Sequence, residues 1–198
     1  MTVDLSRAIA YGGSMEKIKS FAGIGSRVTP PEIIEQMKDI AGLCLAMGYA
    51  LNSGGADGAD SAFEEVYDLY NGPMNIFLPW PGFNNNSSKY TRPKPEAYTI
   101  GATVHPAWEY MKKDSVKALI ARNMHQILGW SLNDPVEFVI CWTQNGQETE
   151  KQYTMKSGGT GSAISLASRH GIPVFNLCND NRFEEFCNFI ADKHHGRS

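Results

Sequence analysis

The chain has 198 residues, of which 42% are hydrophobic, 11% aromatic and 20% charged. This size and composition allow a full hydrophobic core and exclude extensive disorder, so we expect one domain over residues 1–198. The formal net charge of −3 argues against the broad basic surface of many nucleic-acid-binding proteins, although it allows a local anion site. No stretch is long and apolar enough to span a bilayer, and residues 1–17 lack the apolar core of a secretory signal. We therefore expect a cytoplasmic protein with no membrane partner.

The first predicted elements follow a short N-terminal arm. Residues 1–17 are expected to be peripheral, and residues 19–26 are predicted to form a buried strand that ends in glycines. A helix is predicted over residues 29–48, because apolar residues recur there at helical spacing. Thr29 is expected to cap this helix, with Glu32 completing a capping box.

Strands and helices continue to alternate along the rest of the chain. Residues 81–98 have the composition of a long mobile loop, and residues 144–156 that of a polar excursion. Further strands are predicted within residues 49–60, 74–80, 136–143 and 173–177, and further helices within residues 59–72, 111–132, 157–171 and 181–193. This alternation predicts an α/β fold, a Rossmann-like doubly wound and mainly parallel sheet with helices on both faces. Such sheets bind ligands beyond the carboxyl ends of their strands.

The cysteines and histidines give no sign of a metal site. The cysteines are Cys44, Cys141, Cys178 and Cys187, and no pair of them has metal-ligand spacing. We expect all four to be reduced and mostly buried. We expect neither a metal ion nor a cofactor.

Three glycine-rich segments lie where a ligand site is expected. They are the first glycine turn (residues 23–27), the second (53–60) and the third (158–162), and each precedes a predicted helix. Glycine allows the main chain to approach a ligand closely, and a helix start presents free N–H groups to an anion. The alternative is that these glycines serve tight packing between strand and helix. Three such turns together favour phosphate or nucleotide binding.

Two common nucleotide-binding motifs do not fit these turns. The Walker pattern ends in Gly-Lys-Ser/Thr, and no such tripeptide occurs in the chain. The dinucleotide fingerprint needs a third glycine in the first turn, where Val28 stands instead.

A set of motifs spread over about residues 20–178 resembles a known superfamily. The segments GIGSR, SGGADGADSAFE, IFLPW, ARN, FVICW and SGGTGSAISLASRHGIPVFNL occur in this order. They resemble the SLOG superfamily, which joins the Smf/DprA DNA-processing proteins to the LOG-type nucleotide phosphoribohydrolases. The nearest likeness is to the small DprA-like proteins of phages and bacteria. It implies a glycine-rich phosphate pocket that binds a nucleotide or single-stranded DNA, in DNA processing or recombination, and it is compatible with a homodimer.

The resemblance assigns the nucleotide or phosphate site to the three glycine turns and to an Arg-Asn pair, and the Thr160 hydroxyl adds a donor. The candidate residues are Gly25, Ser26, Arg27, Ser53, Gly54, Gly55, Gly58, Asp60, Arg122, Asn123, Gly158, Gly159, Thr160, Gly161 and Ser162.

The resemblance also bears on catalysis. The LOG enzymes carry a glutamate in the last turn, and Ser165 occupies its position here. Without that carboxylate, the positive charge that develops on the ribose in the transition state has no partner. We therefore expect binding without catalysis. The alternatives are a phosphoribohydrolase-like enzyme in which Glu64 or Asp60 replaces the missing glutamate, and a sensor or sponge for a signalling nucleotide in phage defence or counter-defence.

Several candidate side chains also have a structural alternative. Arg27 is expected to clamp a phosphate, or else to be a solvated residue before a helix. Arg122 lies off the apolar side of its helix, so a surface salt bridge is the alternative to phosphate binding. Asp60 either favours the helix dipole or accepts hydrogen bonds from a ribose. Trp142, at a strand end, either packs in the core or stacks on a base.

Overall fold

The computed structural model describes residues 17–195, and the N-terminal arm predicted for residues 1–17 lies outside them except for Lys17. Within the described residues the chain forms a six-stranded sheet in which every neighbouring pair is parallel. The strands are β1 (Ser20–Gly23), β2 (Ala50–Ser53), β3 (Met74–Leu78), β4 (Tyr90–Thr91), β5 (Val139–Cys141) and β6 (Val174–Asn176). The predicted α/β, Rossmann-like fold is confirmed.

The strand order locates the switch point of the sheet. The order is β4-β3-β2-β1-β5-β6, so the chain first moves outward from β1 and then returns to place β5 on the other side of β1. Ala22 in β1 is in register with Asn52 of β2 on one side and Val139 of β5 on the other. Connections of opposite direction leave the carboxyl end of the sheet on either side of β1, which opens a crevice there.

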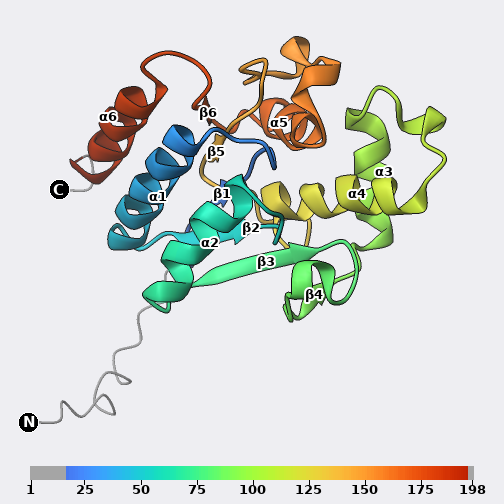
Figure 1. Ribbon diagram of the computed structural model, residues 1–198, viewed down its shortest axis with the longest axis horizontal. Helices are drawn as coiled ribbons and strands as arrows, with labels where there is room; N and C mark the ends of the chain where they lie inside the picture. The colour runs from blue at the N-terminus through green and yellow to red at the C-terminus, as the bar shows by residue number, and fades with distance from the viewer. Residues whose placement is uncertain (1–16, 196–198) are drawn as a thin grey trace, which may run out of the picture.

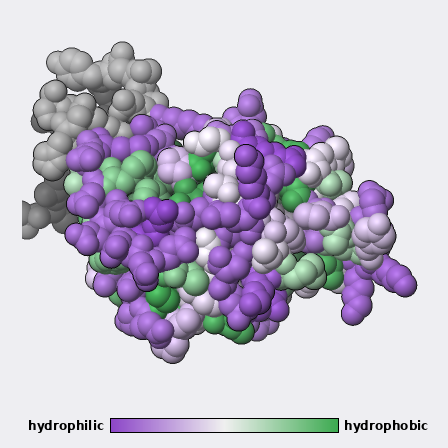
Figure 2. All heavy atoms as spheres, turned by 90° about the horizontal axis from the view of Figure 1, so that it is seen from above, coloured by the Kyte–Doolittle hydropathy of each residue, from purple (hydrophilic) through white to green (hydrophobic). Residues whose placement is uncertain are grey.

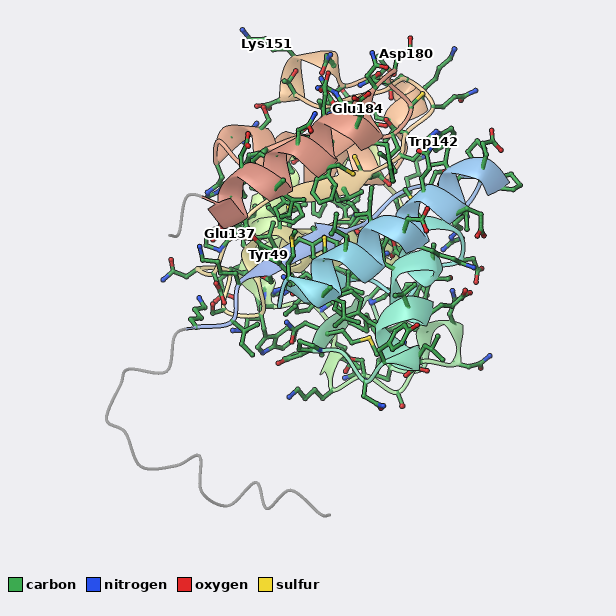
Figure 3. The ribbon with its side chains drawn as sticks, turned by 90° about the vertical axis from the view of Figure 1, so that its left-hand side faces the viewer. Tyr49, Glu137, Trp142, Lys151, Asp180 and Glu184 are labelled. Atoms are coloured by element: carbon green, nitrogen blue, oxygen red, sulfur yellow. The ribbon has the colours of Figure 1, made fainter. Side chains whose placement is uncertain are left out.

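Helices cover both faces of the sheet (Figure 1). One face carries α1 (Pro31–Ala46), α2 (Ala59–Leu69) and α6 (Arg182–His195), and the other carries α3 (Pro95–Val104), α4 (Asp114–Leu128) and α5 (Thr160–Arg169). On the first face, Phe21 of β1 stacks on Phe138 and contacts Phe63 of α2 edge to face. Trp142 belongs to this core and lies between α1 and α6 in Figure 3. The packing alternative for Trp142 therefore holds.

The helix α1 begins differently from the prediction. Its N-cap is Pro30, with Pro31 at the first helical position, and no side chain caps its amides. The Thr29 hydroxyl instead donates to the carbonyl of Ser26 at 2.8 Å, so it ties the helix start to the first glycine turn. The capping box predicted for Thr29 and Glu32 is therefore wrong. Proline at N1 presets the helical φ and removes one of the donors that a cap would serve.

The segments predicted as irregular contain ordered elements. Residues 81–98 hold a short 3-10 turn (Phe83–Asn85), the edge strand β4 and the start of α3. Residues 144–156 hold the 3-10 turn Glu150–Gln152 and the first part of another, Met155–Ser157, each with its own capping box. Such short elements leave no periodic pattern, because most of their residues are polar or lie at an edge.

The surface and the cysteines bear on two further expectations, that no segment spans a membrane and that the cysteines are reduced and mostly buried. In the view of Figure 2 hydrophilic residues predominate and hydrophobic ones form small patches. Within residues 17–195, no helix combines the length and the apolar character that a membrane span requires. The cysteines are all free: Cys44 and Cys141 are buried, Cys187 is half-buried and Cys178 is exposed.

Candidate functional site

An open pocket of about 460 Å³ lies at the carboxyl end of the sheet, beside β1. Its walls come from the segments that follow β1 and β5, from α4, and from the residues around the start of α5. Small-molecule sites commonly have volumes in this range and this place in an α/β fold. The predicted site residues that line it are Gly25, Ser26, Arg27, Asp60, Arg122, Asn123, Gly158, Gly159 and Thr160.

The other predicted residues pack behind this pocket. They are Ser53, Gly54, Gly55, Gly58, Gly161 and Ser162. Gly58 has φ 82°, and a Cβ there would lie 2.6 Å from the carbonyl oxygen of Ser26, so this glycine holds the first two turns together. A Cβ on Gly161 would lie 2.5 Å from that of Ser157. For these glycines the packing alternative is sufficient.

Two glycines of the third turn have no such explanation. A Cβ on Gly158 or Gly159 would meet no atom within 4 Å, and both residues line the pocket. Gly158 has φ 57°, so its backbone favours glycine, whereas Gly159 has an ordinary φ of −64° and its backbone does not require glycine. It is the N-cap of α5, which has no side-chain cap. Bare backbone at a helix start, facing open space, is the arrangement that lets an anion reach main-chain amides.

Arg122 is buried at the back of the pocket, which contradicts the surface salt bridge considered for it. Only 6% of the residue is exposed. Its Nη1 donates to the carbonyl of Gly54 and lies 3.3 Å from Oδ2 of Asp60, which is also buried. A Cβ on Gly54 would collide with this guanidinium, so glycine at 54 is what lets Arg122 cross the second turn.

One edge of the Arg122 guanidinium is left without a protein partner. Nε is buried and has no hydrogen-bond partner among the described residues. The guanidinium also lies over the ring of Phe83, with Cζ 5.9 Å from the centroid. Burial lowers the pKa of Arg122, and the charges of Asp60 and Glu64 oppose that effect. An arginine stays protonated in proteins, so the pocket contains a buried cation with donor capacity to spare.

Two carboxyl groups lie close to this cation. Burial raises the pKa of Asp60, and the charge of Arg122 and the amides of Ala56 and Gly25 oppose that rise. Glu64 accepts a hydrogen bond from the amide of Gly55 at 2.8 Å. Burial and the neighbouring charge of Asp60 raise its pKa to about 7. Asp60 lines the pocket, whereas Glu64 lies behind it.

The residues beside Arg122 connect the turns to one another. Asn123 donates from Nδ2 to the carbonyl of Gly159 at 2.9 Å, so neighbouring residues of α4 hold the second and third glycine turns. In the first turn, the Ser26 hydroxyl accepts from the amide of Val28 at 3.2 Å. Arg27 is exposed at the rim of the pocket, and its side chain has no ion pair or hydrogen bond to the part of the chain that is described.

The sequence did not predict the residue that holds the third glycine turn in place, which is Gln147. Gln147 is fully buried, and its Nε2 donates to the carbonyls of Thr149 and Gly161 and to the Ser165 hydroxyl. Ser165 also donates to the carbonyl of Gly161 at 2.9 Å, so this residue faces the protein and not the pocket. Gln147 lies in the segment 144–156, which has a composition that predicts only solvated loop.

The remaining walls are mixed. Val28, Val116 and Leu119 give an apolar side, while Lys156 and His105 add polar groups. The amide of Ala107 donates to Nδ1 of His105, and burial lowers the pKa of this imidazole. Within the described chain, His105 is the only aromatic ring that lines the pocket. No cluster of three potential metal ligands occurs among residues 17–195.

The fold and the pocket together define an α/β protein of the Rossmann-like class, with an open pocket at its switch point. No protein-family model and no curated protein matches the chain. Among solved structures, the X-ray structure of DNA processing protein A (DprA) from Streptococcus pneumoniae is similar, with a TM-score of 0.51 and 16% sequence identity. The match covers 89% of this chain and 56% of that one. The chain therefore has a DprA-like fold and spans little more than half the length of that protein.

Proposed function

We propose that this protein binds the phosphate group of a nucleotide, free or as part of single-stranded DNA, in the pocket beside β1. The observation that carries the proposal is the pairing of bare backbone at the start of α5 with a buried cation. Gly159 has neither a steric nor a conformational reason to be glycine, and the buried Nε of Arg122 has no hydrogen-bond partner among the described residues. Main-chain amides and a guanidinium edge are the usual ligands of a phosphate.

The rim of the pocket supplies the rest of the proposed site. Arg27 and Lys156 lie at the mouth and add positive charge, while Val28, Val116 and Leu119 offer an apolar surface to a sugar or base. The DprA-like fold and the likeness of the glycine turns to the Smf/DprA branch of the SLOG superfamily make a role in DNA processing the proposed context. Ser165 points into the protein, which supports binding without hydrolysis.

Binding would be tested by thermal shift and calorimetry. The probes would be inorganic phosphate, the nucleoside monophosphates, and short oligo(dT) strands with and without a 5′ phosphate. We expect a nucleotide at one hundred times its dissociation constant to add about 2.7 kcal/mol to the free energy of unfolding. If none of these probes shifts the midpoint at millimolar concentration, the proposal is wrong.

A pair of glycine variants separates binding from folding. Gly159→Val should leave stability near that of the wild type, since its Cβ meets nothing, but should abolish the ligand-induced shift. Gly42→Ala, on the open side of α1, is the control; it should leave the ligand-induced shift unchanged and raise stability by about 0.5–1 kcal/mol, because alanine favours a helix interior. Undiminished nucleotide binding by Gly159→Val would contradict the role given to the third turn.

A second candidate function is cleavage of a nucleotide. The observation that favours it is Asp60, a carboxyl with a raised pKa that lines the pocket 3.3 Å from Arg122. A carboxyl whose pKa is raised by burial can exchange a proton with a leaving base. Release of base from a nucleoside monophosphate, detected by chromatography and lost in Asp60→Asn, would establish this function in place of simple binding.

A further inference from the structure

A second hollow lies on the α4 face of the sheet, where α4 ends. It has a volume of about 520 Å³ and is lined by residues of β2, β3 and β4 and by residues 129–131. Ala50 and Asn52 of β2 are in register with residues that face α4, and Asn52 donates to the carbonyl of Gln126 in that helix. We name it the aromatic groove, after the three rings of Phe77, Tyr90 and Trp130 that line it.

The rings of the aromatic groove form one connected platform. Trp130 lies 5.3 Å from Tyr90 between centroids, and 6.4 Å from Phe77 with an interplanar angle of 3°. Behind them, His125 stacks on Trp130 at 4.8 Å. Tyr90 and Trp130 are only half-buried, so part of each ring faces solvent. Phe77 is buried, and the ordered pair of half-exposed rings, Tyr90 and Trp130, is suited to stacking against planar groups.

His125 fixes the two segments that border this platform. Its Nδ1 is bonded to the carbonyl of Gly129 at 3.0 Å, next to Trp130, and its Nε2 accepts from the amide of Lys94 at 3.1 Å. With Nε2 accepting, the ring is a neutral tautomer that donates from Nδ1. Burial lowers its pKa, which agrees with a neutral ring. The platform and the segment that carries Lys94 are therefore held in a fixed relation.

Three cations lie on the segment that borders the groove. Lys89 Nζ lies 5.0 Å from the centroid of Tyr90, and Lys94 Nζ lies 5.4 Å from that of Trp130. Arg92 lies between them in the sequence and is exposed, with φ 60°. Residues 89–94 contain no acidic residue. At the other border, Asp134 is paired with Lys17, so its charge is balanced.

We propose that the aromatic groove binds single-stranded nucleic acid, with bases stacked on Trp130 and Tyr90 and phosphates held by Lys89, Arg92 and Lys94. Proteins that bind single strands combine aromatic platforms with cations that follow the backbone. The pocket beside β1 has glycine turns and one histidine ring, so it lacks this combination. The groove is a separate site, and it does not depend on the function proposed for that pocket.

Binding would be measured by anisotropy of a labelled oligo(dT) 12-mer at 50 and 200 mM salt, with quenching of tryptophan fluorescence as a second readout. The triple variant Lys89→Ala, Arg92→Ala, Lys94→Ala should lower the slope of log affinity against log salt by about 2, because each phosphate contact to a single strand contributes about 0.7. Trp130→Ala should weaken binding by about 5- to 150-fold, as loss of one stacked base does. Trp130→Phe should retain most of the affinity and lose part of the quenching.

The matched control is a second triple variant, Lys112→Ala, Lys113→Ala, Lys151→Ala, which removes the same charge from exposed positions outside the groove. It should keep the salt slope of the wild type. The groove variants should keep any shift that mononucleotides produce, which separates the groove from the pocket beside β1. No binding of the 12-mer at 50 mM salt, an unchanged slope in the groove variant, or a self-association that this variant abolishes would overturn the proposal.

Discussion

Removing the charge of Arg122 alone should destabilise the protein far more than removing it together with the charge of Asp60. Only 6% of Arg122 and 3% of Asp60 are exposed, and the two groups lie 3.3 Å apart. At that distance their attraction is about 5 kcal/mol with an effective dielectric constant of about 20. Arg122→Met leaves the buried carboxylate without this partner, and such a loss typically costs about 3–5 kcal/mol. Adding Asp60→Asn removes the unpaired charge and should restore about 2 kcal/mol or more.

The assay is urea unfolding at pH 7.5 for the wild type, both single variants and the double variant, followed by tryptophan fluorescence. A double-mutant cycle then gives the coupling free energy, which we expect to be about 2–3 kcal/mol. The control cycle uses Arg169→Met and Glu150→Gln, an ion pair at the surface, for which about 1 kcal/mol or less is expected. If the effects of the two buried substitutions are additive within about 0.5 kcal/mol, Arg122 and Asp60 are not coupled, and the buried ion pair described at the back of the pocket does not contribute to stability.

Three further outcomes follow from the structure. The folded-state pKa of Glu64 is about 7, above the usual 4.5, so the folded state holds this proton more tightly than the unfolded state. Ionisation of Glu64 should therefore lower the free energy of unfolding by about 1–3 kcal/mol as the pH rises from about 5 to 8. Glu64→Gln should flatten this pH dependence, measured by urea unfolding at pH 5, 6 and 8. Gly58→Ala should lower the free energy of unfolding by more than 1 kcal/mol, since φ at this residue is 82° and the new Cβ would collide with the Ser26 carbonyl. A smaller loss would mean that the first and second glycine turns can separate with little change in free energy. Asn176→Leu should lower the free energy of unfolding by about 2–4 kcal/mol in the same assay, because Nδ2 donates to Thr143 Oγ1 and to the carbonyl of Gln147 inside the core. An unfolding free energy close to that of the wild type would show that other groups replace these hydrogen bonds.

The sheet could be predicted because its central strands are buried on both faces. Residues such as Phe21 and Leu51 lie in short apolar runs that lead into glycines, Ile140 lies in an apolar run that leads into a polar segment, and the helices between them carry regular apolar stripes. Strand β4 escaped prediction because it has only two residues and lies at the sheet edge. Helix α3 escaped because proline and lysine residues precede it and resemble a loop.

The glycine turns of the candidate site could be predicted from the sequence, but the burial of Arg122 and the contacts of Gln147 could not. Arg122 lies off the apolar stripe of α4, which suggests an exposed side chain, yet the face it occupies is turned toward the carboxyl end of the sheet. Periodicity distinguishes core from non-core and cannot distinguish solvent from a pocket wall. The role of Gln147 depends on a bond to Gly161, 14 residues away in the sequence, which no local pattern encodes.

The hydrogen bonds from Arg122 to Gly54 and from Asn123 to Gly159 make the position of the second and third glycine turns depend on the rotation of α4 about its axis. Each residue advances an α-helix by about 100°, so one inserted or deleted residue between Asn123 and the turn at Gly129 would swing both side chains away from both loops at once. Engineering of the pocket's width should accordingly be directed at residues 105–116 and should leave the second half of α4 intact.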